Sequence, residues 1–99
     1  MKPISFGQET IYARELTYLE YEEYARSLRA NDKEPFWDRL FNLLIRHAVR
    51  EDGTRRFQDR SELVGLPSKT VLKAAYAFSE AFTKLNLVTD DDIDELRKN

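Results

Sequence analysis

Residues 35–50 read PFWDRLFNLLIRHAVR and form the most apolar stretch of this 99-residue chain. Pro35 suits the first turn of a helix, because its missing N–H would have no helical partner there. Wound as an α-helix, the stretch presents apolar side chains over about 200° of its circumference. These side chains are Phe36, Trp37, Leu40, Phe41, Leu43, Leu44, Ile45 and Ala48. So wide an arc predicts a central helix over 35–50, buried against two neighbours or against one neighbour and a partner chain.

Helix-starting signals lie on both sides of this segment. Residues 17–20 have the spacing of a capping box, in which Thr17 and Glu20 each bond the other's backbone amide. They predict a helix that ends near Ala30. Residues 59–62 repeat the pattern and predict a short helix that Gly65 closes.

Two more helices are expected toward the C-terminus. We expect Ser68 to cap a helix over 69–85 and Asn86 to take the left-handed position that ends it. One stripe of that helix is apolar and should face the core: Val71, Ala75, Phe78, Phe82 and Leu85. Residues 89–92 place acids at the positive end of a helix dipole, which predicts a short, acidic-capped terminal helix over 90–99.

Together these patterns predict an all-α fold, a single small domain of four to five helices over residues 1–99. Residues 1–9 carry no pattern and are expected to be mobile. The β-branched and aromatic residues of 10–16 allow one short β element near the N-terminus, with 50–57 as the other place for it. In the second segment Asp52-Gly53 predicts a turn, and Phe57 is expected to anchor the extended piece that follows.

The composition argues against catalysis. The chain has no cysteine and one histidine, which leaves no thiol nucleophile and no cysteine zinc site. His47 lies inside the apolar arc, where we expect a partly buried, hydrogen-bonded side chain rather than a general base. The acidic run 90–95 lacks the spacing of an EF-hand loop and is expected to be a solvated helix start. We therefore predict no enzyme, no metal and no cofactor.

Charge and hydropathy argue against nucleic-acid and membrane partners. The net charge is −2, and the arginines of residues 46–60 alternate with acids, which favours salt bridges within the domain or to an acidic protein. The longest apolar stretch is far too short to span a bilayer, and no signal peptide is expected at the start. Tyrosines crowd residues 12–24, however, and this side chain is enriched where proteins meet.

Two parts of the chain resemble a known family. Residues 10–17, TIYARELT, followed by a Glu-rich helix, resemble the opening of tail assembly chaperones from long-tailed bacteriophages. Residues 50–57, REDGTRRF, then Leu66-Pro67-Ser68, then Leu85-Asn86-Leu87, are similar to that family's acidic turn, long-helix start and long-helix end, in the same order. The chain departs from the family pattern at Arg50, where the family has an acid, and in lacking a glycine after Asn86.

The resemblance implies a non-catalytic role in the host cytoplasm. Proteins of this family bind the long, helical tape measure protein, keep it soluble, help to recruit tail tube subunits and are absent from the mature virion. Many have a second, longer product made by ribosomal frameshifting. Such a chaperone is expected to self-associate along its client and to need exposed apolar surface. The candidate partner-binding residues are Leu19, Tyr21, Phe36, Trp37, Phe41 and Ile45.

Two other functions stay open at this point. In a small DNA-binding regulator, the segments 59–65 and 68–85 would form a helix-turn-helix pair. Against this, Val71, Ala75 and Phe78 must face the core, and the net charge is negative. A head–tail connector subunit would share the phage context but would be present in mature particles.

Overall fold

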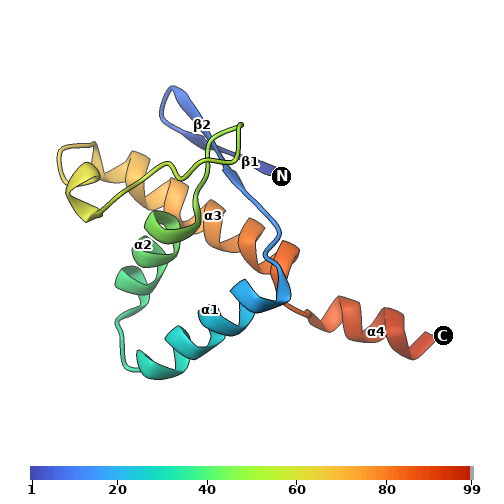
Figure 1. Ribbon diagram of the computed structural model, residues 1–99. Helices are drawn as coiled ribbons and strands as arrows, with labels where there is room; N and C mark the ends of the chain where they lie inside the picture. The colour runs from blue at the N-terminus through green and yellow to red at the C-terminus, as the bar shows by residue number, and fades with distance from the viewer. Residues whose placement is uncertain (99) are drawn as a thin grey trace.

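A two-stranded β-hairpin and three helices enclose one hydrophobic core in the computed structural model, which describes residues 1–98 (Figure 1). A fourth helix extends from this body and buries none of its residues. The elements are β1 (Lys2–Phe6), β2 (Glu9–Ala13), α1 (Tyr18–Ala30), α2 (Phe36–His47), the single 3₁₀ turn η1 (Arg60–Glu62), α3 (Ser68–Asn86) and α4 (Asp90–Lys98). The predicted all-α fold of four to five helices is therefore wrong, because the hairpin contributes one face of the core.

The hairpin forms because its two strands alternate apolar and polar side chains. Ile4 and Phe6 on β1, with Ile11 and Ala13 on β2, point inward and are buried, as the period of two in a strand requires. The strands pair in antiparallel register from Lys2 opposite Ala13 to Phe6 opposite Glu9, which leaves a two-residue turn. Gly7 begins that turn with a φ of +62°, in the left-handed region that a first turn residue of this kind requires.

The N-terminus was therefore predicted wrongly. Residues 1–9, expected to be mobile, contain β1, and Ile4 and Phe6 are each only 6% exposed. Two inward side chains are too few to establish a period, and their burial depends on β2 and α3, which lie elsewhere in the chain. The short β element expected over 10–16 corresponds to β2, whose last residue is Ala13.

The sheet continues beyond β2 and shortens the central helix. The N–H of Tyr12 donates to the carbonyl of Val49 at 2.9 Å, and the N–H of Val49 donates back at 3.0 Å. Val49 also forms a bridge with Arg55. The predicted helix over 35–50 therefore ends at His47, because the next residues leave the helix to pair with β2. The turn between these two extended pieces holds Gly53 at a φ of +87°, as its Asp-Gly sequence predicts.

The local signals at the other helix ends give a mixed outcome. The capping boxes at Thr17 and at Asp59 are both formed, but the second opens only η1 instead of a helix that reaches Gly65. Pro67, not Ser68, precedes the first residue of α3. The apolar stripe of α3 is buried as predicted, with its last member, Leu85, partly so.

The expected conformation of Asn86 is wrong. Among the described residues, only Gly7 and Gly53 have a positive φ, and Asn86 is the last helical residue of α3. The predicted terminal helix over 90–99 is α4, and Thr89 bonds the Asp92 side chain at its start. Residue 99 lies outside the described residues.

Candidate functional site

Aromatic side chains form an exposed row on α2. Phe36 is 59% exposed and Trp37 is 43% exposed, and their ring centroids lie 5.4 Å apart in an edge-to-face contact. The Trp37 ring then stacks on Phe41 with centroids 6.0 Å apart. Phe41 is only partly buried and packs on the edge of the core. The row forms because α2 has more apolar residues than the core can cover, so the side of its arc that faces away from the core stays in solvent.

A groove continues this row from Phe41 onto α3. Its space is about 250 Å³, and apolar side chains from the η1–α3 connection and α3 line it, among them Val64, Leu66 and Leu72. These three are exposed in the free protein. The guanidinium of Arg60 lies 5.3 Å from the Phe41 ring centroid and is held there by a 3.0 Å bond to Asp38. This ion pair is at the surface, so it contributes more to the position of Arg60 than to stability.

At its other end the row reaches a second hollow. Phe36 and Leu40 from α2, with Tyr76 from α3, line a space of about 390 Å³. Tyr76 is also exposed. We call the combined feature the α2–α3 apolar surface; its exposed and partly buried members are Phe36, Trp37, Phe41, Val64, Leu66, Leu72 and Tyr76. Exposed apolar side chains gathered in one region of a small domain are typical of interaction sites.

The sequence candidates divide into three groups in the structure. Phe36, Trp37 and Phe41 belong to the α2–α3 apolar surface. Ile45 is 6% exposed and belongs to the core, so it lies outside this surface. Leu19 and Tyr21 lie on α1. Leu19 is exposed, and the ring centroid of Tyr21 lies 6.4 Å from those of Tyr18 and Tyr24.

Four members of the surface were missed from the sequence. Leu72 and Tyr76 are four residues apart on α3 and lie off its core stripe, which is a signal that the helical period could have revealed. Val64 and Leu66 lie in the irregular segment between η1 and α3, where no period exists. Only the tertiary structure places them beside α2.

His47 lies in the angle between the three long helices. Its ring centroid is 5.9 Å from that of Tyr24 and 5.1 Å from that of Phe82. Burial lowers the pKa of His47 to about 4, and the positive charges of Arg14 and Arg46 act in the same direction. The side chain is half-buried, as predicted, but within residues 1–98 its ring forms none of the expected hydrogen bonds. With this lowered pKa the ring is neutral at pH 7. It packs three helices together and is one wall of a polar hollow of about 160 Å³.

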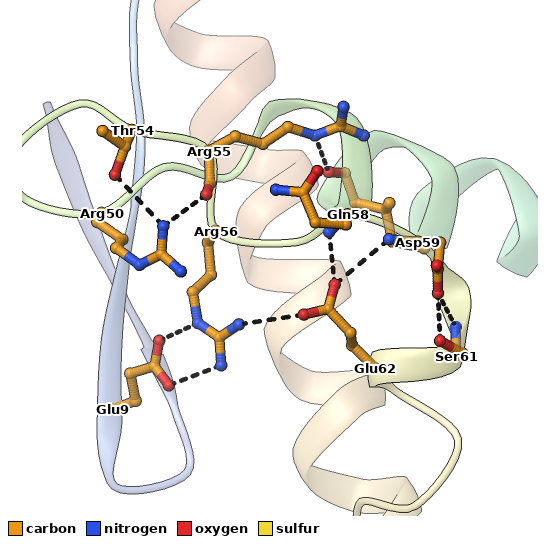
Figure 2. A network of polar contacts seen from close by, with 10 residues as sticks. Glu9, Arg50, Thr54, Arg55, Arg56, Gln58, Asp59, Ser61 and Glu62 are labelled. Atoms are coloured by element: carbon orange, nitrogen blue, oxygen red, sulfur yellow. Dashed lines mark hydrogen bonds and ion pairs between the residues drawn. The ribbon is translucent and has the colours of Figure 1, made fainter.

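The arginine-rich segment after α2 is occupied by contacts within the domain. Figure 2 shows Arg56 between two acids: it forms an ion pair with Glu9 of the hairpin and lies 3.9 Å from Glu62 of η1. Hydrogen bonding to Arg56 lowers the pKa of Glu9. Arg50 donates to the carbonyl of Arg55 at 2.7 Å. This network joins the hairpin to the η1 segment. Salt bridges within the domain are one of the two outcomes that the alternating charges of residues 46–60 predicted.

The geometry also bears on the helix-turn-helix alternative. That motif needs two helices, whereas η1 is a single 3₁₀ turn of three residues. The side of α3 that carries Val71, Ala75 and Phe78 is buried. The expected pair of helices over 59–65 and 68–85 is therefore not formed.

Comparisons with known proteins find no matching family, no matching curated sequence and no matching solved structure. Within residues 1–98, no group of histidine and acidic side chains is arranged to hold a metal ion. Across the same part of the chain, none of the helices combines the length and apolar character needed to cross a membrane. The α2–α3 apolar surface is thus the feature on which a functional proposal can rest.

Proposed function

We propose that this protein is a tail assembly chaperone of a long-tailed bacteriophage or prophage. In this role it binds the tape measure protein in the host cytoplasm, keeps it soluble, and helps to recruit tail tube subunits without catalysing a reaction. The observation that carries the proposal is the α2–α3 apolar surface. The resemblance of residues 10–17 and 50–87 to the family supplies the particular client.

The shape of the surface suits a helical client. An amphipathic helix binds a groove through apolar anchors spaced three, four and seven residues apart. The groove beside Phe41 and the hollow beside Phe36 offer two places for such anchors, and Trp37 lies between them in the aromatic row. Rigid aromatic side chains lose little conformational entropy on binding, so they are efficient contributors to such an interface.

Co-expression with the tape measure protein from the same genome tests the proposal. We expect the client to become soluble and to co-purify with this chain. Trp37→Ala should weaken the complex by roughly 30-fold, which corresponds to about 2 kcal/mol for a central aromatic residue. Because Trp37 is 43% exposed in the free protein, the same change should leave folding largely intact.

Matched variants separate binding from folding. Tyr18→Ala removes an aromatic side chain that is exposed on α1, away from the surface, and should leave client binding unchanged. Leu72→Ala should weaken binding from the α3 side of the groove. A folded protein that leaves the tape measure protein insoluble and unbound would reject the proposal. Detection of the chain in purified mature particles would favour a head–tail connector subunit instead.

A further inference from the structure

A basic hollow lies on α3 next to the apolar surface, and Glu80 and Lys84 line both this hollow and the space beside Tyr76. Strand β1 and α3 form its walls, and its space is about 770 Å³. Four lysines surround it, namely Lys2, Lys69, Lys73 and Lys84. Glu80 is the one acid among the lining residues. Within residues 1–98, none of these lysines forms an ion pair with an acid of the same chain. Small and apolar residues such as Pro3 and Ala77 line the space between them, so a helix can approach closely.

The projecting helix α4 has the opposite charge. Its nine residues include five acids and two bases, and it buries no residue against the body (Figure 1). Asp90, Asp91 and Asp94 lie within about 100° of one another around the helix axis. In the part of the chain that the structure describes, these three aspartates have no ion-pair partner. Beside them, Ile93 and Leu96 form an apolar edge that is also left exposed.

We propose that α4 of one copy docks into the basic hollow of a second copy. The aspartates then face Lys69 and Lys73 on α3, and the apolar edge of α4 covers Pro3 and Ala77. Glu80 gives the basic end of α4, at Arg97 and Lys98, an acid to meet. The charge complementarity of the two surfaces carries the proposal, which stands whether or not the client proposal is correct.

The arrangement has a consequence for assembly. Donor helix and acceptor hollow are different surfaces of the same chain, so the contact is heterologous and each copy can bind one neighbour at each end. Reciprocal exchange of α4 closes a pair of copies, whereas exchange with successive neighbours forms a ring or an open row. The hollow shares Glu80 and Lys84 with the space beside Tyr76, but it shares no residue with the groove beside Phe41, so a docked α4 leaves that groove accessible.

Sedimentation of the full chain tests the contact. At about 0.01 M ionic strength, where the Debye length is roughly 30 Å, we expect the average mass to increase with protein concentration; at about 1 M salt it should return to that of the monomer. The donor variant Asp91→Lys/Asp94→Lys and the acceptor variant Lys69→Glu/Lys73→Glu should each weaken association by at least about tenfold. Mixing the two variants should restore it, because each then offers the charge that the other needs.

A control pair and a cross-link complete the design. Glu22→Lys/Glu23→Lys changes the same number of charges on α1 and should leave association unchanged. The chain has no cysteine, so Asp94→Cys/Lys73→Cys introduces one thiol on each surface, and oxidation should join separate chains. A chain that is monomeric at both ionic strengths, a mixture that fails to associate, or a cross-link only within one chain would each overturn the proposal. Binding of an oligonucleotide to the lysines without self-association would also overturn it, in favour of a nucleic-acid surface.

Discussion

Removal of the Asn86 side chain tests how α3 is joined to the start of α1. The Oδ1 atom of Asn86 accepts a hydrogen bond from the N–H of Leu16 at 2.7 Å. Its Nδ2 group donates to the carbonyl of Arg14 at 3.1 Å and to that of Phe82 at 3.2 Å. The amide thereby bonds two backbone groups of the segment between β2 and α1, which lie 70 and 72 residues away in the chain. Asn86→Ala removes all three bonds.

The expected cost follows from the two backbone groups that lose their partner. A buried donor or acceptor left unpaired costs about 1–3 kcal/mol. The N–H of Leu16 and the carbonyl of Arg14 are part-buried, so water can replace some of each bond. We therefore expect Asn86→Ala to lower the free energy of unfolding by about 2 kcal/mol, near the low end of the sum. A domain is typically stable by about 5–15 kcal/mol, so the loss is readily measured.

Urea denaturation followed by circular dichroism measures this change. The midpoint should decrease while the slope stays constant, since the exposed area on unfolding is the same. Asn31→Ala is the matched control, because Asn31 also ends a helix but its side chain bonds only Ser27 of its own helix, at an exposed site. That variant should change the stability by less than about 0.5 kcal/mol. If Asn86→Ala is as stable as Asn31→Ala, Asn86 does not join α3 to the β2–α1 segment.

Three further perturbations have defined outcomes. Lowering the pH from 7 to 5 should reduce the free energy of unfolding by about 1 kcal/mol, after allowance for the partial exposure of His47. Burial lowers the pKa of His47 in the folded state to about 4, whereas the unfolded chain takes up the proton near 6.5, so protonation favours the unfolded state. His47→Gln should flatten the unfolding free energy across that range, and an unchanged slope would contradict the assignment. Phe57→Ala should cost about 3–5 kcal/mol in urea unfolding, since Phe57 is fully buried against Phe6 with ring centroids 5.4 Å apart. Gly7→Ala should lower the free energy of unfolding by about 1–2 kcal/mol through the positive φ alone. The new Cβ lies at an ordinary contact distance of 3.5 Å from Thr70, so no steric clash adds to the cost. An unchanged melting temperature would show that the turn changes type.

The candidate site was only partly readable from the sequence. An apolar arc on α2 wider than one core requires indicated surplus surface, and Phe36 and Trp37 are indeed exposed. The arc does not show which of its sides faces the core, so the sequence could not place Ile45 in the core. That choice depends on where α3 and the hairpin lie, and both are distant in sequence from α2.

The features that the sequence alone predicted correctly depend on interactions between residues close together in the chain. A capping box joins residues three apart, so the helix start after Thr17 and the η1 turn after Asp59 follow from a few neighbouring side chains. The helical period of α3 likewise identified its buried stripe before any partner was known. These features depend on contacts within one or two turns of backbone.

The tertiary structure decided what depends on distant partners. Strand β1 exists because β2 and α3 cover its two inward side chains, and α2 ends at His47 because Val49 pairs with Tyr12. Asparagine is a residue type typical of helix ends, yet the side-chain amide of Asn86 holds the distant segment between β2 and α1. Each of these outcomes is a competition between a local preference and a contact made only when the chain is folded, and in each the distant contact supplies the larger free energy.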